Sequence, residues 1–443
     1  MITVIGTGTG AGTGTGAAAG PLALGAADLV VGAARHLDAA QLPPHARRLE
    51  LGPLAPALDV VARYVREERP VTVLASGDPG FFGIVRALGE RFGPAALDVR
   101  PAAPSIATAF ARLGLSWDDA VVVSAHGRAL RTAVNVCRAH RKVAVLTGPG
   151  AGPAELGAAL AAAGEGAGQE VEQGAGAART LVVASALGTA EESVVRVSPA
   201  QAAGRPWPAA GSVVLCLGPG ASLPAAQART VAGPPAAPAR WALPEEEFAH
   251  RDSMVTKAEV RALVLARLGP RTGDLVWDVG AGSGSVAVEC ARFGAAVVAV
   301  ERDADGVARI RANAAAHGVD VEAVHGAAPG VLGRLPEPDA VFIGGGGARL
   351  PAIVARCAER ARRSVVVTLA AVDRVAAVRG ALRAAGLVTD GVLLQASRLA
   401  PLPGEVSRLA AVNPVFVVWG IRPEAVAGPV PVREPGFAER TLT

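Results

Sequence analysis

The sequence predicts an α/β fold in both halves of the chain, and three observations support this. The chain has 443 residues, about twice the length of an ordinary domain. Short runs rich in Val and Leu alternate with Ala-rich helical segments, as in sheets that are covered by helices on both faces. A stretch rich in Pro, Ala and Gly at 219–240 breaks this alternation, so we interpret it as an interdomain linker.

The first domain, 1–218, contains seven expected strands. They lie at 2–6, 28–33, 71–80, 119–128, 142–148, 180–188 and 212–218. Continuous apolar runs between helical segments favour parallel strands that are buried on both faces. The stretch 149–178 predicts one helix and a Gly-rich connection.

The second domain, 241–423, begins with an amphipathic helix within 256–270. Thr256 and Glu259 have the spacing of a capping box, and Gly269 with the following proline predicts the end of the helix. Strands are expected at 274–279, 296–301, 320–324, 340–344, 364–369, 387–395 and 414–419. This pattern predicts a doubly wound sheet of about seven strands. The Pro-rich tail, 424–443, has no assigned role.

Composition excludes several classes of protein. Apolar residues make up 51 % and charged residues 19 %, which excludes disorder of the whole chain. The net charge is +4 without a basic run interleaved with aromatics, so a nucleic-acid partner is not expected. The mild basic excess would suit a polyanionic small substrate. The four cysteines show no CxxC spacing, so we expect buried thiols and no metal site. With no apolar run of about 18 residues and no signal peptide, we expect no membrane association and a cytoplasmic location.

The stretch "DVGAGSG" has the order of a nucleotide-binding βαβ unit. A strand ends at Val279, Gly280–Gly284 forms the turn, a helix follows from about Ser285, and the next strand ends at Glu301. Glycines let the backbone approach the ligand, and an acid at the end of the second strand can accept hydrogen bonds from both ribose hydroxyls. The spacing is GxGxG led by Asp278, whose carboxylate can orient the loop and a ligand ammonium. This favours S-adenosyl-L-methionine over NAD.

Four stretches of the second half carry a family resemblance: "LPEEEFAHRDSMVTKAEVRALVLARLGP" (243–270), "DVGAGSGSVAVE" (278–289), "HGAAPGVLGRLPEPDAVFIGGGG" (325–347) and "RLAAVNPVFVVWG" (408–420). In this order they resemble the C-15 methyltransferases and decarboxylases of the corrin ring, which have a Rossmann-like fold. The resemblance implies cofactor contacts from Thr256, Gly280, Ala281, Gly282, Ser283, Gly284, Glu301 and Ala328. At the position of Ala327, relatives often carry an acid whose side chain can contact the adenine. In this chain, backbone groups must make that contact.

The first half resembles the tetrapyrrole methylases, and in particular corrin C-5 methyltransferases. The matching stretches are "ITVIGTGTG" (2–10), "LASGDPGFFGI" (74–84), "APSIATAFARLGL" (103–115) and "VVSAHGRAL" (122–130). This family has two α/β lobes with a cleft between them, and the resemblance implies cofactor contacts from Gly77, Asp78 and Pro79. A plain type I turn is the alternative interpretation of "SGDPG".

The run "GTGTGAGTGTG" at Gly6–Gly16 follows the first expected strand. It lacks the Gly-Lys-Ser/Thr of a P-loop, and in the resembling family this connection faces the tetrapyrrole. We therefore expect Gly8 to line the substrate side.

The resemblance implies one chain with two activities. It would methylate C-5 and C-15 of precorrin-6B, or of its cobalt form, with one S-adenosyl-L-methionine per half, and remove the ring C acetate as carbon dioxide in cobalamin biosynthesis. Arg128 and Arg261 are candidates for binding the substrate carboxylates. His126 is either a substrate contact or a turn residue, and Lys257 and Arg261 are either substrate contacts or solvated helix surface. No catalytic acid or base is named.

Two rival functions remain at this stage. One is a tRNA adenine methyltransferase, which has a similar C-terminal fold, and the other is a non-catalytic tetrapyrrole-binding protein. The missing basic, aromatic-rich stretch and the entire first half argue against the first rival, and the intact glycine motif argues against the second. A homo-oligomer is compatible with the sequence.

Overall fold

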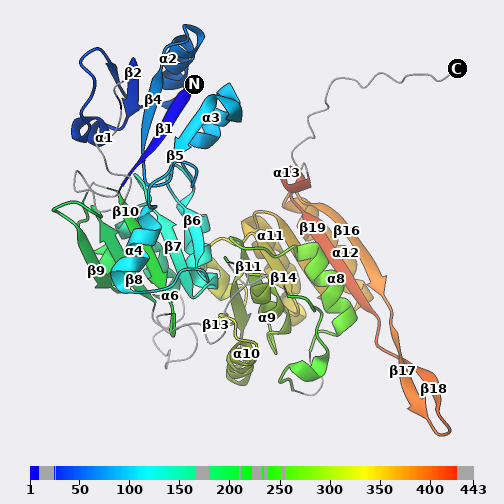
Figure 1. Ribbon diagram of the computed structural model, residues 1–443. Coiled ribbons are helices and arrows are strands. Elements are labelled where there is room, and N and C mark those ends of the chain that lie inside the picture. The colour runs from blue at the N-terminus through cyan, green and yellow to red at the C-terminus, as the bar shows by residue number, and fades with distance from the viewer. Residues whose placement is uncertain are drawn as a thin grey trace, which may run out of the picture. The chain divides into compact units, whose positions relative to one another are not determined.

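The computed structural model describes residues 1–8, 24, 26–165, 179–208, 211–221, 232–233, 238–251 and 255–426. The chain divides into two compact units, one made of Met1–Ala162 with Ala177–Pro235 and the other mainly of Ala236–Thr443 (Figure 1). The glycine run beyond Gly8, most of the expected linker and nearly all of the tail lie outside the described residues.

The first sheet of the first unit has five strands in the described residues, and all of them are parallel in the order β3-β2-β4-β1-β5. The strands are β1 (Ile2–Thr7), β2 (Leu29–Gly32), β3 (Arg47–Glu50), β4 (Val71–Ser76) and β5 (Leu97–Arg100), and the helices that connect them are α1 (Ala34–Ala39), α2 (Leu54–Arg66) and α3 (Val85–Phe92). The parallel arrangement brings the ends of β1 and β4 to one edge, where the Gly-Asp-Pro stretch begins.

The second sheet of this unit is mixed, with the order β6-β7-β10-β8-β9 among the described residues. It consists of β6 (Val121–Ser124), β7 (Lys142–Leu146), β8 (Thr180–Ser185), β9 (Ser193–Val197) and β10 (Ser212–Leu217). Strand β10 runs antiparallel to β7 and β8, so the expectation of parallel strands is wrong here. The reason is that a continuous apolar run reports burial on both faces and carries no information about direction.

Helices cover both faces of this second sheet. Ile106 and Phe110 of α4 (Ser105–Leu113) pack with Leu215 on one face. Residues of α5 (Leu130–Ala139), α6 (Pro153–Glu165) and α7 (Pro199–Ala203) pack with the alternate strand residues Val214 and Cys216 on the other. Helix α6 confirms the helix expected in 149–178, and the two sheets confirm the two-lobed fold expected of the first half.

The second unit has a sheet of seven strands within the described residues, in the order β13-β12-β11-β14-β15-β19-β16. The strands are β11 (Leu275–Val279), β12 (Ala296–Glu301), β13 (Glu322–His325), β14 (Ala340–Ile343), β15 (Ser364–Leu369), β16 (Val388–Leu394) and β19 (Val415–Ile421). The helices are α8 (Ala258–Leu268), α9 (Ser285–Arg292), α10 (Ala304–Ala316), α11 (Leu350–Arg360), α12 (Val375–Ala384) and α13 (Pro423–Val426). Only β19 runs antiparallel to its neighbours in this described sheet, and the doubly wound fold is confirmed.

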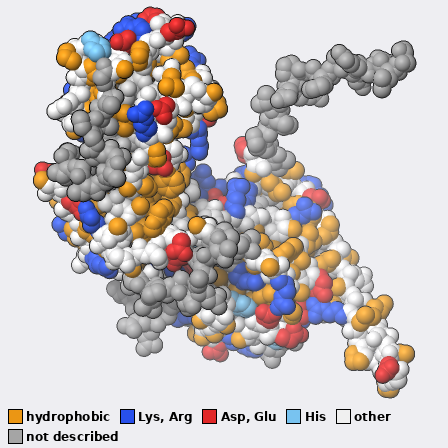
Figure 2. Space-filling view, in the orientation of Figure 1, with side chains coloured by type: hydrophobic (Ala, Val, Ile, Leu, Met, Phe, Trp, Pro, Cys, Tyr) orange, Lys and Arg blue, Asp and Glu red, His pale blue; other side chains and the backbone are white. Residues whose placement is uncertain are grey.

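A hairpin of β17 (Ser397–Leu402) and β18 (Val406–Ala411) was not expected from the sequence. It extends from the second unit beyond β16 and β19 (Figure 1). Leu399 and Leu409 face each other across the hairpin and are 77 % and 68 % exposed, and Figure 2 shows hydrophobic side chains along this arm. Exposed apolar side chains of this size on a two-stranded ribbon offer a contact surface.

The start of α8 differs from the expected capping box. The N-cap residue is Lys257, and no side chain caps the helix in the way that Thr256 was expected to. Instead the Ala258 N–H donates to Glu245 Oε1 at 2.7 Å. Arg398 of β17 binds both Glu245 and Glu259, and its guanidinium holds the pKa of Glu245 down at about 2. Glu259 is therefore used to anchor the hairpin rather than to cap the helix.

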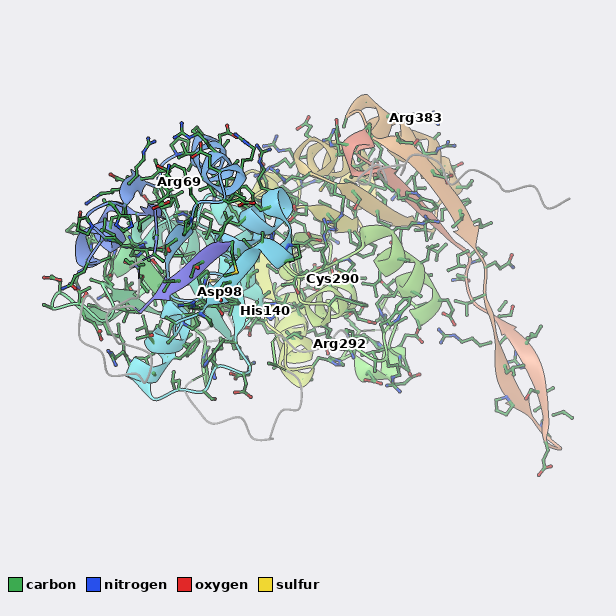
Figure 3. The ribbon with its side chains drawn as sticks, turned by 45° about the horizontal axis from the view of Figure 1, so that its top comes forward. Arg69, Asp98, His140, Cys290, Arg292 and Arg383 are labelled. Carbon is green, nitrogen blue, oxygen red and sulfur yellow. The ribbon has the colours of Figure 1, made fainter. Side chains whose placement is uncertain are left out.

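The cysteines are buried free thiols, as expected. Cys290 lies on α9 with Arg292 nearby, and both are labelled in Figure 3. In the described part of the chain, no helix is both long and apolar enough to cross a membrane.

Candidate active sites

The loop between β11 and α9 requires glycine at the positions that the motif predicts. Gly280, Gly282 and Gly284 have φ angles of +74°, +58° and +72°. A Cβ atom at Gly284 would lie 3.0 Å from a side-chain carbon of Ile310, and one at Gly280 would lie 3.3 Å from the backbone of Gly345. Side chains are excluded there by conformation and by contact, so the backbone is left open to a ligand.

Asp278, the acid before this loop, has one carboxylate oxygen without a partner. Its Oδ2 accepts a hydrogen bond from the Ala287 N–H at 3.0 Å, whereas Oδ1 is buried and unpaired among the described residues. Burial raises the pKa of Asp278 to about 7, against the Ala287 hydrogen bond and with help from the charge of Glu301. A buried, unpaired carboxylate oxygen beside a glycine loop fits the ammonium of S-adenosyl-L-methionine.

Glu301, at the end of β12, is held against the glycine loop by backbone donors. Its Oε2 accepts from the Gly282 N–H at 2.8 Å, and its Oε1 accepts from Arg302 and Asp303 at 2.9 and 3.0 Å. A carboxylate has about four acceptor positions, so one stays available to a ribose hydroxyl. The Gly326 N–H donates to the Glu301 carbonyl at 2.8 Å, which brings the segment leading to Ala328 to the same edge. The cofactor contacts expected of Glu301 and Ala328 stay predictions.

Two further groups of this site were not predicted from the sequence. The Gly344 N–H donates to the Val279 carbonyl at 3.0 Å, so the glycines after β14 line the other side of the loop. The sequence feature that could have identified these glycines is a second Gly-rich run that directly follows an expected strand. Buried Asn313 of α10 donates to the Ser283 carbonyl at 2.7 Å and to the Ala249 carbonyl at 2.9 Å, which ties the glycine loop to the segment before α8.

Arg261 lies in the core of the second unit, which argues against both roles expected for it, a substrate contact and solvated helix surface. Its side chain is fully buried, and its Nε donates to Glu289 Oε1 at 2.7 Å. Its remaining nitrogens donate to the carbonyls of Thr256 and Leu243, and the guanidinium lies over the Phe248 ring. The arginine thus organises the entry to α8.

Thr256 and Lys257 are half-buried residues at the start of α8. The Thr256 carbonyl accepts from Arg261, and Lys257 is the N-cap residue. Their expected contacts with the cofactor and the substrate stay predictions.

In the first unit, the Gly-Asp-Pro loop packs tightly against the end of β1. Gly77 has a φ of +58°, and its N–H donates to the Thr7 carbonyl at 2.8 Å. A Cβ atom at Gly6 would lie 2.1 Å from the Gly77 carbonyl oxygen, so that position tolerates glycine alone. Asp78 Oδ1 accepts from the Gly80 N–H at 2.8 Å, which fixes the turn that contains Pro79. The expected cofactor contacts of this loop stay predictions.

The turn after β6 approaches this loop from the other sheet of the same unit. His126 and Arg128 are exposed, and the Arg128 guanidinium lies 5.6 Å from the centre of the Phe82 ring. Phe82 has a φ of +54°, which is unusual for a bulky residue, and is 43 % exposed. The structure therefore brings the two predicted loops together and adds an exposed aromatic ring that sequence reasoning missed.

Gly8 is exposed, and a Cβ atom built on it would meet no other atom within 4 Å. Packing alone therefore does not require glycine there, and its expected role in substrate binding stays a prediction.

Comparison with known proteins separates the same two halves. Residues 1–203 match the family of tetrapyrrole (corrin/porphyrin) methylases, and residues 246–419 match the precorrin methyltransferase domain. The chain is 36 % identical over 186 residues to a probable cobalt-precorrin-6B C(15)-methyltransferase (decarboxylating) of Pyrobaculum calidifontis, covering 40 % of this chain and 93 % of that protein. It is 34 % identical over 168 residues to a cobalt-precorrin-7 C(5)-methyltransferase of Salmonella typhimurium, covering 38 % of this chain and 80 % of that protein.

A further relative spans both halves. The precorrin-6Y C(5,15)-methyltransferase (decarboxylating) of a Sinorhizobium species is 37 % identical over 350 residues, which cover 78 % of this chain and 78 % of the relative. Together with the two domain matches and the two sites above, this identity shows that the chain belongs to the family of precorrin-6Y C(5,15)-methyltransferases (decarboxylating).

Proposed function

We propose that this chain methylates C-5 and C-15 of precorrin-6B, or of its cobalt form, and removes the ring C acetate as carbon dioxide. In this proposal 1–218 carries the C-5 reaction, 219–240 is a linker, and 241–423 carries the C-15 reaction and the decarboxylation. The observation that carries the proposal is the presence of two different loops suited to a nucleoside ligand, one in each unit: Gly77–Pro79 and Gly280–Gly284. The names of the relatives support the choice of substrate.

The main role of the protein in the proposed reaction is to align the methyl donor with the acceptor carbon. S-adenosyl-L-methionine, when bound, supplies an activated methyl group on its sulfonium. In the second unit, Asp278 would hold the ligand ammonium, and Glu301 would accept a hydrogen bond from a ribose hydroxyl. The backbone of the glycine loop would lie against the ligand. Holding donor and acceptor carbons in line accelerates transfer without any covalent step by the protein.

Arg128 and Phe82 would bind the tetrapyrrole in the first unit. The guanidinium pairs with substrate carboxylates, and the exposed ring packs against the flat macrocycle. Decarboxylation needs an electron sink, which the conjugated imine of the substrate provides, so the protein has to orient the carboxylate and favour the shift of charge.

The proposal includes two cofactors per chain, a small-molecule tetrapyrrole as substrate, and action in the cytoplasm. It also accommodates a homo-oligomer, for which the exposed Leu399 and Leu409 of the hairpin offer an apolar surface.

The direct test is product analysis. The chain is incubated with methyl-labelled S-adenosyl-L-methionine and precorrin-6B, and the product is examined by mass spectrometry and carbon NMR. We expect two labelled methyl groups, at C-5 and C-15, and one molecule of carbon dioxide per product. A tRNA substrate should take up no label. Tetrapyrrole binding without label transfer would favour the non-catalytic alternative.

Binding of the cofactor to the second unit is expected to weaken as pH falls below about 7. The raised pKa of Asp278 means that its neutral form predominates below pH 7, whereas the ligand ammonium favours the charged form. Between about pH 5.5 and 7 the ligand amine stays protonated, so each unit of pH lost should weaken binding by up to about tenfold. Calorimetry in buffers of different ionisation enthalpy should detect release of a proton on binding.

The matched variant for this prediction is Asp278→Asn. It should bind weakly at every pH in this range and release no proton at the second site. The wild-type site losing no affinity between pH 7 and 5.5 would contradict the role of Asp278.

A further inference from the structure

A cluster of Arg35, His36 and Ser76 lies at the carboxyl edge of the first sheet. Ser76 is the last residue of β4, and Arg35 and His36 follow β2 within α1. Because β2 and β4 are parallel neighbours, their ends meet at the same edge, which also carries Gly77–Pro79. Ligands of open α/β sheets bind outside this edge.

Hydrogen bonds fix the protonation of this cluster. Arg35 Nη2 donates to Ser76 Oγ at 2.8 Å, and Arg35 Nε donates to His36 Nε2 at 3.2 Å. Ser76 Oγ lies 3.0 Å from the same His36 Nε2. A guanidinium is only a donor, so Nε2 must be the accepting nitrogen and the imidazole proton is on Nδ1. Burial, and then the charge of Arg35, lower the pKa of His36 to about 4, although the Leu74 carbonyl opposes this. The imidazole is thus neutral at neutral pH, and the cluster carries one positive charge.

Arg35 differs from many exposed arginines of the same unit in the kind of partner it has. Several of those arginines pair with an Asp or Glu: Arg48, Arg69, Arg91, Arg100 and Arg112. Within the described residues, Arg35 has no carboxylate partner, and both of its acceptors are neutral. Two of its five N–H groups are used, so the guanidinium is oriented and still has donors for a carboxylate.

We infer that Arg35, positioned by His36 and Ser76, binds a carboxylate of a ligand of the first unit. The inference rests on the proposed function, which supplies two sources of this group. One is an acetate or propionate of the tetrapyrrole, and the other is the methionyl carboxylate of S-adenosyl-L-methionine. Both sources present the planar anion that a guanidinium binds through paired hydrogen bonds.

The test measures binding to the full chain, separately for precorrin-6B and for S-adenosyl-L-methionine. Arg35→Gln should raise the Kd of the ligand whose carboxylate it holds by roughly ten- to hundredfold, since a charged hydrogen-bonded contact is lost. A rise for precorrin-6B identifies a ring carboxylate, and a rise for the cofactor at the first site identifies the methionyl group. Either result supports the inference, and no change beyond about threefold for both ligands overturns it.

The positioning role of His36 has its own readout. His36→Gln keeps an oxygen that can accept from Arg35 Nε and should leave both Kd values within about threefold, whereas His36→Leu should weaken the same ligand as Arg35→Gln does. Equal effects of the two His36 variants would contradict a positioning role.

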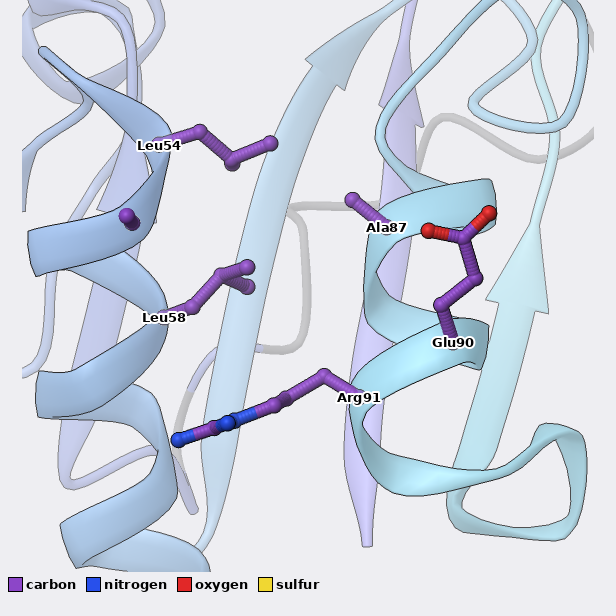
Figure 4. Close-up of a pocket in the computed structure, with 6 residues that line it drawn as sticks. Leu54, Leu58, Ala87, Glu90 and Arg91 are labelled. Atoms are coloured by element: carbon purple, nitrogen blue, oxygen red, sulfur yellow. The ribbon is translucent and has the colours of Figure 1, made fainter.

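The matched control is Arg91→Gln. Arg91 pairs with Asp59 and lines a hollow of about 400 Å³ between α2 and α3, together with Leu54 and Leu58 (Figure 4). It lies at the end of α3 that leads into the start of β5. Arg91 is therefore near the amino ends of the strands, opposite to the carboxyl ends where Arg35 lies. This variant should change neither Kd.

The ligand whose Kd does not change reports that the first unit of each variant is folded, because both ligands bind that unit. Binding is measured without turnover, so the two proposals can fail separately. A wild-type chain that binds both ligands but does not methylate C-5 would contradict the proposed function, while the Kd values of Arg35→Gln would still decide whether Arg35 holds a carboxylate.

Discussion

A Gly282→Asp chain is expected to bind one equivalent of S-adenosyl-L-methionine where the wild type binds two. Gly282 has a φ of +58°, and its N–H donates to Glu301 Oε2 at 2.8 Å. Aspartate at this position adds strain of about 1 kcal/mol and places a second carboxylate beside Glu301, facing the ligand. The new side chain enters open space above the loop, where the ligand would meet the backbone, and the repulsion between the two carboxylates distorts the loop. The second site should therefore weaken by roughly a hundredfold or more. Titration calorimetry measures the number of sites and their affinities.

Gly318→Asp is the matched control for this substitution. Gly318 also has a positive φ, +65°, and a Cβ atom on it would likewise meet nothing within 4 Å, but it follows α10 away from the loop. It should keep both binding sites. C-15 methylation should be lost in Gly282→Asp while C-5 methylation persists. A wild-type chain with a single site would contradict the two-site account.

The second large effect is expected from Arg261→Ala, and it should fall on stability. The side chains of Arg261 and Glu289 are both fully buried, and Arg261 Nε lies 2.7 Å from Glu289 Oε1. Without Arg261, Glu289 keeps two backbone N–H donors and Arg292 at 3.7 Å but loses its buried ionic partner. Breaking a buried ion pair typically costs about 3–5 kcal/mol. Urea unfolding followed in the second unit should show this loss.

Arg356→Ala provides the comparison, because Arg356 forms an exposed ion pair with Glu359 on α11. Its loss should cost at most about 1 kcal/mol. If Arg261→Ala kept the stability of the unit and raised the KM for C-15 methylation alone, the buried role would be contradicted and the substrate-binding role restored.

These two positions also show what the sequence can predict. The glycines at Gly280–Gly284 were identified because a positive φ is a local requirement that the sequence must satisfy with glycine. Arg261 was misjudged because charged side chains on helices usually face solvent, while its partner Glu289 lies 28 residues further along the chain. No local sequence pattern predicts an ion pair between residues that are this far apart in the chain.

Strand prediction succeeded where strands are buried. All seven strands of the sheet in the second unit were expected, and in most of them the apolar run records burial by the helices. The exception is β16, which was expected from its apolar residues although most of its side chains are exposed. The short polar strands β3 and β5 were missed, because four-residue edge strands with exposed side chains carry no such signal. The direction of β10 was missed because apolar runs do not encode it, and the contact of Arg35 with Ser76 depends on which strands are neighbours in the sheet.

The central claim is that each unit carries its own methylation, and separating the two units tests it most directly. The described core clusters each draw their residues from one unit alone, so a cut between Pro235 and Ala236 crosses little core and each fragment should fold. With labelled cofactor and precorrin-6B, the fragment 236–443 is expected to methylate C-15 and release carbon dioxide without the other. If carbon dioxide release instead follows the fragment 1–235, the assignment of the two reactions is contradicted.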